Sequence, residues 1–272
     1  MTPEAMKTEI NARNWEVSAF DSDTFEPKAH RHVVLIPVIN EGERIQNQLR
    51  KMHEIAIEKQ MDVVVVDGGS TDGSLAEDFL RSVGVRALLT KRGPGKLSAQ
   101  LRCGYAWALL EGYDGIITID GNGKDGVDTL PQFAEALDEG FSYIQASRFA
   151  PGGHSSNTPL SRLLAIRLIH SPLLSLGAGH FFTDTTQGYR GYSKEYLLHP
   201  GTQPFRDVFV RYELLAYLTV RASQLGFRVK EIGTSRVYPE NEKVPTKISG
   251  ISALVDLVLV ALGATLRTYH PR

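Results

Sequence analysis

Short, fully apolar runs alternate along the first half of the chain with longer segments whose apolar residues recur at helical spacing. The apolar runs predict buried strands at 33–38, 62–67, 85–89 and 115–120. The intervening segments predict helices at 45–59, 74–83 and 97–111. Strands that lack a polar face are typical of a parallel sheet covered by helices on both sides. The pattern therefore predicts an α/β fold with a mostly parallel central sheet.

The pattern loosens in the second half of the chain but continues. It predicts strands at 141–147 and 229–232, and apolar helices at 160–176, 212–225 and 251–268. A charged residue, Asp256, interrupts the last helix, and no segment reaches the roughly 18 to 20 consecutive apolar residues of a spanning helix.

Neither a repeat nor a low-complexity linker divides the chain. Residues 1–30 lack a clear periodicity and are expected to form an N-terminal arm. Residues 31–250 are expected to form one continuous domain. Residues 251–272 are expected to form an apolar helix that packs on this domain or lies at a membrane surface.

Polar side chains follow three of the predicted strands. Asn40 and Glu41 come after the first strand, Asp67 ends the second, and Asp120 and Asn122 end the fourth. Ligands of open parallel sheets bind outside the carboxyl ends of the strands, so these residues are expected along one edge. Helix capping would explain one such residue, but three acidic strand ends without cationic partners would repel one another. The sequence therefore predicts a ligand site at this edge.

Composition narrows the class of protein. Lys plus Arg is 30 and Asp plus Glu is 31, which leaves a formal charge of −1. This balance argues against a protein that coats nucleic acid, so no nucleic-acid partner is expected. A single cysteine, Cys103, excludes an internal disulfide and a cysteine-based zinc site.

The chemistry of the strand-end residues suits a phosphorylated ligand. Hard cations such as Mg²⁺ bind carboxylate and amide oxygens together with phosphate oxygens, and Asp120 and Asn122 offer such atoms. Asp125 is a further carboxylate nearby in the sequence, and the basic residues Arg92, Lys96 and Arg148 are candidates to meet phosphates.

Two known phosphate-binding motifs fit poorly. The segment 93–96 ends like a P-loop, but the position six residues before Lys96 is Thr90 and Leu97 follows the lysine, so the motif fails. The glycines at 121, 123 and 126 have dinucleotide-motif spacing but follow the fourth strand instead of the first. A nicotinamide-dependent dehydrogenase is therefore disfavoured.

Five segments in order resemble the motifs of family 2 glycosyltransferases with the GT-A fold, closest in layout to the dolichyl- or polyprenyl-phosphate sugar transferases. They are VLIPVINE at 34–41, VVVDGGSTDG at 64–73, ITIDGNG at 117–123, ASRF at 146–149 and DTTQGYR at 184–190. The resemblance covers roughly residues 31 to 250. It implies a mostly parallel sheet with helices on both faces and a Rossmann-like nucleotide-binding half.

The resemblance also implies roles for individual residues. The nucleotide pocket is expected to include Pro37, Asn40, Glu41, Asp67, Gly68, Lys96 and Asp120. The catalytic residues are expected to be Asp120, Glu213, Arg148 and Arg190, with the two arginines facing the diphosphate or an acceptor phosphate. A divalent cation, Mg²⁺ or Mn²⁺, is expected on Asp120 and Asn122.

Two positions depart from the family pattern. The usual D-x-D metal motif stands here as Asp120-Gly121-Asn122, which removes one carboxylate from the cation site, although Asp125 is placed to compensate. The second motif has Asp67-Gly68-Gly69 where Asp-Asp-Gly is common, which removes a carboxylate near the nucleotide. Metal dependence is therefore less firmly implied than membership of the family.

The expected reaction is transfer of a sugar from a nucleotide-diphosphate sugar to a polyprenyl phosphate or a saccharide, with inversion, in cell-envelope or surface glycan synthesis. A sugar-phosphate nucleotidyltransferase and a non-catalytic glycosyltransferase-like subunit are the alternatives. The first 31 residues are polar, so the expected location is cytoplasmic, including the inner face of the membrane. Peripheral membrane contact and a homo-oligomer stay open as further partners.

Overall fold

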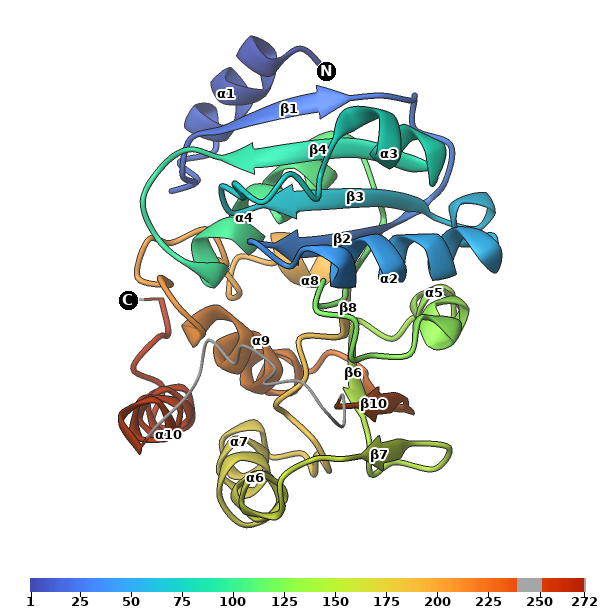
Figure 1. Cartoon of the computed structure of the whole chain (residues 1–272). Coiled ribbons are helices and arrows are strands. Elements are labelled where there is room, and N and C mark those ends of the chain that lie inside the picture. Colours follow the sequence, from blue (N-terminus) through green and yellow to red (C-terminus); the bar gives the residue numbers. More distant parts are fainter. Residues whose placement is uncertain (239–250, 272) are drawn as a thin grey trace.

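An eight-stranded mixed sheet forms the centre of the molecule in a computed structural model that describes residues 1–238 and 251–271 (Figure 1). The strand order across the sheet is β1-β4-β3-β2-β5-β8-β6-β9. The strands are β1 (Phe20–Thr24), β2 (His32–Val38), β3 (Asp62–Asp67), β4 (Val85–Lys91), β5 (Gly115–Thr118), β6 (Tyr143–Ser147), β8 (Arg190–Ser193) and β9 (Val229–Gly233).

Helices cover both faces of this sheet, as the apolar runs predict (Figure 1). One face carries α2 (Glu43–Glu54), α3 (Glu77–Ser82) and α5 (Leu130–Asp138), together with the short helices η1 (Ile57–Lys59) and η2 (Val127–Thr129). The other face carries α1 (Pro3–Ala12), α4 (Leu97–Leu110), α8 (Lys194–Leu198) and α9 (Glu213–Gln224).

The two hydrophobic cores follow from the period of two along each strand. In β2, Val33 and Leu35 point into the core beneath α4, whereas Val34 and Ile36 point into the core beneath α2. All four side chains are fully buried. A strand buried on both faces has no polar alternation, which is why the sequence shows continuous apolar runs.

Within the eight-stranded sheet, the strands not expected from the apolar pattern are the antiparallel β1 and β8. The segment 1–30, expected as an arm, contributes α1 to one face and β1 to the sheet edge, where β1 pairs with β4. At the edge β1 needs few apolar residues, and its sequence FDSDT is mostly exposed. The strand β8 lies between β5 and β6 and is antiparallel to both, inside a stretch that the polar residues at 183–188 obscure.

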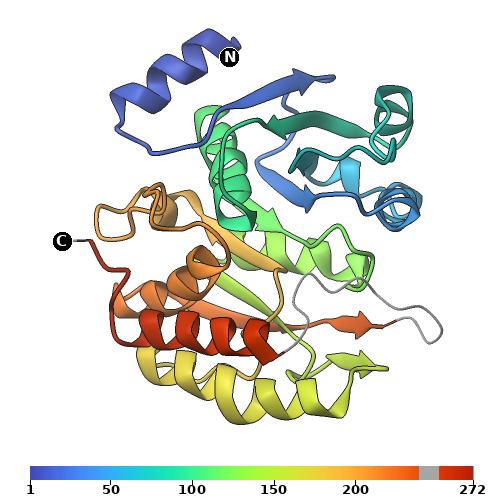
Figure 2. The same cartoon turned by 60° about the vertical axis from the view of Figure 1, so that its left-hand side comes forward.

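A smaller layer lies beside the carboxyl half of the sheet. Here β7 (His154–Ser156) and β10 (Ser235–Val237) form a two-stranded parallel sheet. A continuous helical segment follows β7, made of α6 (Leu160–Ala165), the π-helix η3 (Ile166–His170) and α7 (Ser171–Ala178). The apolar helix α10 (Ile251–Thr265) packs against α7 and α9 (Figure 2). Within the described residues, no helix is both long and apolar enough to cross a membrane.

Candidate functional site

The predicted edge of polar residues exists because β2, β3 and β5 are parallel neighbours. In the sheet β2 lies between β3 and β5, and Val38 pairs with Asp67 at the carboxyl end. The chain leaves these strands at Ile39, Gly68 and Ile119, so the segments that carry Asn40, Asp67 and Asp120 emerge along one edge. This arrangement creates the ligand-binding edge of an open α/β sheet.

Side-chain hydrogen bonds join the loops after β2 and β3. The Asn40 side chain accepts a bond from the Thr71 amide at 2.8 Å, and the Asn40 amide donates to the Ser70 hydroxyl at 3.0 Å. Asn40 has a φ of 51°, a left-handed conformation that asparagine tolerates better than most residues. The buried Asp67 accepts bonds from the Ser70 amide at 2.8 Å and the Ser70 hydroxyl at 2.6 Å. The two loops therefore form one preorganised wall.

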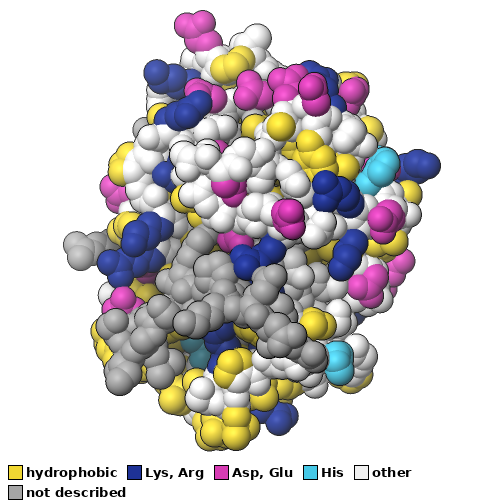
Figure 3. Space-filling model, viewed as in Figure 1, with side chains coloured by type: hydrophobic (Ala, Val, Ile, Leu, Met, Phe, Trp, Pro, Cys, Tyr) yellow, Lys and Arg dark blue, Asp and Glu magenta, His cyan; other side chains and the backbone are white. Residues whose placement is uncertain are grey.

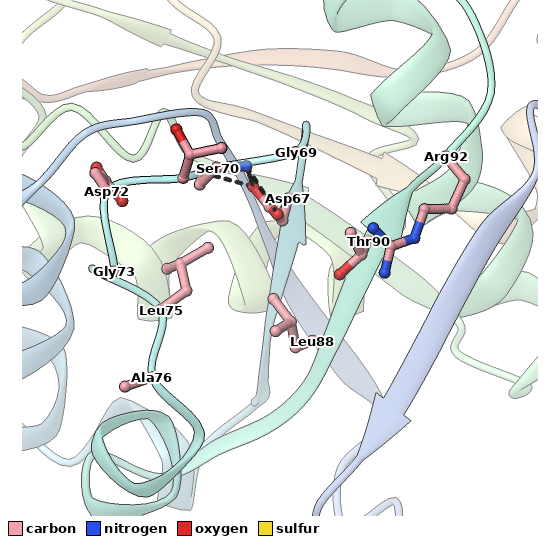
Figure 4. A pocket seen from close by; sticks show the side chains of 11 residues that line it. Asp67, Gly69, Ser70, Asp72, Gly73, Leu75, Ala76, Leu88, Thr90 and Arg92 are labelled. Atoms are coloured by element: carbon pink, nitrogen blue, oxygen red, sulfur yellow. Dashed lines mark hydrogen bonds between the residues drawn. The ribbon is translucent and has the colours of Figure 1, made fainter.

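A pocket of about 500 Å³ opens beside this wall, between the ends of β3 and β4. Figure 4 shows Asp67 bonded to Ser70, with Thr90 and Arg92 to the right of this pair, Leu88 below it and Leu75 at the lower left. Arg92 pairs with Asp21 at 2.6 Å in the edge strand β1. Apolar surface flanked by a carboxylate and a guanidinium suits a nucleoside.

Of the residues predicted to contact the nucleotide, Asp67 lines this pocket and the others lie outside it. Gly68 lies against Gln100, and the Gln100 side chain donates to the backbone carbonyl of Val38. Gln100 therefore stabilises the turn that follows β3. Pro37 is half-buried near Gly121. Glu41 is half-buried, 3.9 Å from Arg44, and lines a separate hollow of about 330 Å³.

Lys96 is exposed just before α4, and its backbone amide donates to Val210. Neither Lys96 nor Glu41 lines the pocket beside Asp67.

Asp120 is the least enclosed carboxylate at the end of β5, with a side chain 26% exposed. The backbone of Gly188 fixes its position from behind, because a Cβ atom there would lie 2.3 Å from an Asp120 carboxylate oxygen. The Asn122 amide nitrogen lies 3.5 Å from the other oxygen, and the Asn122 carbonyl oxygen accepts the Lys124 amide at 3.2 Å. Asp120 thus presents a fixed carboxylate toward the open edge.

This donor set fits a divalent cation with Asp120 as its carboxylate and the Asn122 carbonyl oxygen as a second ligand, provided that a diphosphate supplies further oxygens. Among the described residues, no cluster of three or more histidine, cysteine or acidic side chains has metal-binding geometry. The protein therefore offers a site that a nucleotide completes.

Asp125, expected to compensate for Asn122, is not available to a cation. Its side chain is fully buried, and both carboxylate oxygens accept bonds from one terminal nitrogen of Arg236 at 2.6 Å. The other terminal nitrogen of Arg236 lies 3.8 Å from Asp120. The expectation for Asp125 is therefore corrected, because an internal cation already occupies its carboxylate.

Tyr238 is the centre of a group of basic residues next to Asp120. Its hydroxyl accepts a bond from Arg162 at 3.0 Å, and the Lys124 ammonium lies 5.0 Å from the centre of its ring. The guanidinium of Arg236 lies 5.8 Å from the same ring. Burial would raise the pKa of the Tyr238 phenol, but Arg236, Arg162 and Arg148 together lower it to about 8. We call Lys124, Arg148, Arg162 and Arg236 the cationic cluster.

Arg148, the arginine of the ASRF segment, is 4% exposed. Its Nε donates to Asp184 at 2.7 Å and one terminal nitrogen donates to Thr186 at 3.1 Å. The other terminal nitrogen is buried and has no hydrogen-bond partner within residues 1–238 and 251–271. An unsatisfied buried guanidinium donor is costly, and an anionic ligand would satisfy it. The placement agrees with the expected phosphate role of Arg148, which remains a prediction.

Arg190, expected to face a phosphate, lies in the core at 2% exposure. Its guanidinium donates to the backbone carbonyls of Gln187, Thr185 and Leu215. These acceptors turn it toward α9 and the loop before β8, away from the strand edge. This geometry differs from the expected contact with a ligand, and the catalytic role of Arg190 remains a prediction.

Glu213 begins α9, where its carboxylate accepts the backbone amides of Val210 at 3.0 Å and Arg211 at 2.6 Å. These two bonds fix the turn that leads into α9. The neighbouring Tyr212 lies close enough to Asp120 for that charge, after burial, to raise the pKa of its phenol. Glu213 is therefore near the site but already engaged, and its catalytic role remains a prediction.

The residues that sequence reasoning did not assign are Lys124, Arg162, Arg236 and Tyr238. Arg162 lies on α6, Arg236 lies in β10, and Lys124 follows Asn122, so no short motif contains them together. The antiparallel bridge between Asp125 and Arg236 brings them side by side. Lysine and arginine are rarely buried unless they are paired, so the burial of Lys124 and Arg236 marks this group in the structure. The sequence does not show that burial.

Comparison with known proteins agrees with this geometry. The family model described as glycosyl transferase family 2 matches residues 33–199. A polyprenol monophosphomannose synthase from Mycolicibacterium smegmatis is 29% identical over 234 residues, 85% of each chain. An undecaprenyl-phosphate mannosyltransferase from Micrococcus luteus is 31% identical over 228 residues, 81% of this chain and 88% of the relative.

Solved structures with the same fold include a glucosyl-3-phosphoglycerate synthase from Mycobacterium tuberculosis in complex with Mn²⁺, uridine diphosphate and phosphoglyceric acid. It has a TM-score of 0.59 at 16% identity, over 86% of this chain and 78% of that one. A mannosyl-3-phosphoglycerate synthase from Rubrobacter xylanophilus has a TM-score of 0.60 at 14% identity, over 98% and 78%. The chain therefore has the GT-A fold, belongs to glycosyl transferase family 2 and is a nucleotide-sugar-dependent glycosyltransferase.

Proposed function

We propose that this glycosyltransferase moves a sugar, with inversion, from a nucleotide-diphosphate sugar to a polyprenyl phosphate at the inner face of the membrane. The nucleoside would occupy the pocket between Asp67 and Arg92. The diphosphate would extend along the strand edge toward Asp120. Both curated relatives are named for polyprenyl-phosphate mannosyl transfer, which favours a lipid phosphate over a saccharide as acceptor.

The helix α6 is the observation that supports a lipid phosphate most directly. From this helix Arg162 donates to Tyr238, which lies at the centre of the cationic cluster beside Asp120. On the same short helix, Leu160 is 71% exposed and Leu164 is 50% exposed. A ligand with an anionic head and an apolar tail matches an element that is cationic toward the site and apolar toward the outside.

A phosphate acceptor is already anionic, so it requires positioning by cations and no general base. Arg148 and Arg162 of the cationic cluster would hold this phosphate, with the unsatisfied nitrogen of Arg148 as one donor. An oxygen of the phosphate attacks the anomeric carbon as the bond to the nucleotide breaks, and the leaving diphosphate carries away the electron pair. Asp120 and Asn122 would hold a divalent cation, which supplies charge to stabilise that leaving group.

Peripheral membrane contact is part of this proposal. Large apolar side chains project from the continuous helical segment α6–η3–α7, its following turn and α10, and several gather at the lower edge of the molecule in Figure 3. We call them the apolar face, and the most exposed are Leu160, Leu168, Leu176, Phe181, Leu259 and Leu266. Apolar patches of this kind on a surface mark interaction sites.

Transfer assays with matched acceptors test the proposal. The protein is incubated with radiolabelled nucleotide sugars, GDP-mannose among them, and with undecaprenyl phosphate, undecaprenol or a soluble oligosaccharide. Label is expected in the lipid fraction with undecaprenyl phosphate alone, since undecaprenol lacks the charge that the cationic cluster binds. Transfer to the oligosaccharide would contradict the proposal that the acceptor is a polyprenyl phosphate. Release of pyrophosphate from a nucleoside triphosphate and a sugar phosphate would indicate a nucleotidyltransferase instead.

A further inference from the structure

The charge around Asp120 is unusual for a site that relies on a divalent ion. Asp120 is the half-exposed carboxylate, and Asn122 is neutral. Asp125 is bound by Arg236, which lies 3.8 Å from Asp120 through its second terminal nitrogen. Lys124 is 8% exposed and close enough to Asp120 for the two charges to interact. Two carboxylates and two cations thus leave this group without net negative charge.

Arg236 has donor capacity to spare. Its residue is 7% exposed, and one terminal nitrogen is used by Asp125. The guanidinium also interacts with the Tyr238 phenol, but among the described residues its Nε atom is buried without a hydrogen-bond partner, and its second terminal nitrogen lies 3.8 Å from Asp120. A buried cation with unsatisfied donors remains strongly attractive to an anion, because low local dielectric weakens screening.

A site with two acidic metal ligands repels a diphosphate unless the cation is present. At this site the repulsion from Asp120 is offset by Arg236 and Lys124, which belong to the protein and cannot dissociate. The Asn122 amide removes the second negative charge and presents a nitrogen toward Asp120. Each of these features lowers the need for a bound divalent ion when a diphosphate approaches.

We propose that Arg236 is a built-in cation of the diphosphate site, so that this enzyme binds its nucleotide with little dependence on a divalent metal. The inference rests on the proposed function, since it places the diphosphate beside Asp120. Asp125 acts as a positioning residue that holds the Arg236 guanidinium there. Asn122 is the substitution that makes the arrangement work, because a carboxylate at 122 would restore the need for a metal.

Nucleotide affinity, measured by calorimetry with UDP and GDP, tests this inference without relying on turnover. Each titration is run with Mn²⁺ and with EDTA. We expect the dissociation constant of the wild-type protein in EDTA to lie within about tenfold of that in Mn²⁺. The variant Asn122→Asp is expected to widen that ratio to about 100-fold and to bind Mn²⁺ more tightly, as seen by electron paramagnetic resonance of the free ion.

The double variant Asp125→Asn/Arg236→Gln removes both charges of the buried pair, which avoids leaving either one unpaired. It should lose nucleotide affinity in EDTA by about tenfold or more while keeping most of its affinity in Mn²⁺. Arg228→Gln changes an exposed arginine that donates to the backbone carbonyl of Glu139, and it serves as the control for net charge. Thermal unfolding of each variant verifies folding before titration.

The outcomes separate the two levels of inference. Wild-type binding that requires Mn²⁺, with a ratio that Asn122→Asp leaves unchanged, overturns the role of Arg236 but leaves a metal-dependent glycosyltransferase. Loss of affinity to the same extent in EDTA and Mn²⁺ for the double variant also overturns it. Failure of both nucleotides to bind under either condition overturns the proposed function itself, and the inference with it.

Discussion

Gly188 shows how one residue can control the position of the Asp120 carboxylate. Its backbone lies so close to Asp120 that a Cβ atom would stand 2.3 Å from one carboxylate oxygen. Thr118 reinforces this contact by donating its hydroxyl to the Gly188 carbonyl at 2.8 Å. Asp120 cannot retreat toward β8, so its oxygens point to the strand edge.

The variant Gly188→Ala should therefore displace Asp120 without unfolding the protein, because the carboxylate is 26% exposed and has room to turn outward. A displacement near 1 Å at a reacting group costs roughly 100-fold in rate. We expect kcat to fall by about that factor in the lipid-transfer assay, with a melting temperature within a few degrees of the wild type. An unchanged kcat would show that the position of Asp120 does not matter for transfer.

The Arg148–Asp184 pair predicts a large effect on stability. Both side chains are almost fully buried, at 2% and 0% exposure, and their contact is 2.7 Å. Asp184→Asn leaves a buried guanidinium without its counter-charge, so we expect a loss of about 3–5 kcal/mol in the free energy of unfolding. Chemical denaturation with urea measures this loss.

A matched control is Asp21→Asn, which breaks the exposed 2.6 Å pair with Arg92. Exposed pairs contribute about 1 kcal/mol or less, so this change should be small. If the two substitutions cost the same, burial does not set the strength of the Arg148–Asp184 pair.

At residue resolution the sequence predicts the strand-end residues well and the cationic cluster poorly. Asn40, Asp67 and Asp120 follow strands that are continuous in the sequence, so strand order alone places them together. Arg236 is more than 100 residues from Asp125, and only the path of β10 brings them into contact. Arg190 belongs to a recognisable motif, yet its role depends on the carbonyl of Leu215 in α9, which the motif does not contain.

At the level of elements, the π-helix η3 joins the segment that carries the apolar face to the loop before β8. Its last residue, His170, makes a 2.7 Å hydrogen bond with the Thr185 hydroxyl, two residues before Gln187. Burial lowers the pKa of His170 to about 4, with a smaller contribution from Arg190. The folded protein therefore requires a neutral imidazole at this position.

This shift predicts a pH dependence of stability. Because the folded pKa lies below the ordinary value of 6.5, the stabilisation is complete above pH 6.5 and is lost as the pH falls through 4. In the wild type, His170 should lower the free energy of unfolding by roughly 3 kcal/mol as the pH falls between these limits. We expect His170→Gln to abolish this part of the fall. Urea unfolding at several pH values measures it. The control His53→Gln alters an exposed histidine and should retain the wild-type slope.

The predicted elements succeed where burial is continuous and fail where it is not. The parallel strands β2 to β5 appear as apolar runs because both of their faces are covered. Among the described elements, β1 and β8 escape prediction for different reasons: β1 is an exposed edge strand, and β8 has the sequence RGYS, in which an arginine is fully buried by its hydrogen bonds. Tertiary hydrogen bonding, which a local pattern cannot contain, decides both.

At the scale of the whole molecule, the helical segment that begins with α6 carries part of the apolar face and one arginine of the cationic cluster. Arg162 reaches inward to Tyr238, whereas Leu160 and Leu164 face solvent. A lipid acceptor presented from a membrane at this face would bring its phosphate to the cationic cluster without leaving the bilayer surface. The sequence predicts both apolar helices, at 160–176 and 251–268, but not their common surface, because α7 and α10 meet only in the folded chain.

Removal of apolar side chains from this face should weaken binding to vesicles. Leu168, Leu176 and Phe181 are 69%, 77% and 77% exposed, and their replacement by serine removes apolar area at about 25 cal/mol per Å². We expect the triple variant to partition at least about tenfold less to vesicles of phosphatidylglycerol and phosphatidylethanolamine in a sedimentation assay. The matched control replaces Ile55, Leu198 and Val208, exposed at 44%, 39% and 49%, by serine and should leave partitioning unchanged.

A second copy of the chain is the competing occupant of the apolar face, and light scattering distinguishes the two. If membrane contact is its role, the wild type and the triple variant have the same mass in solution, and the variant loses lipid transfer while retaining nucleotide affinity. This separation is expected because none of the substituted side chains lines the pocket beside Asp67. A wild-type dimer that the triple variant converts to a monomer, with vesicle binding unaffected, would assign the face to self-association instead.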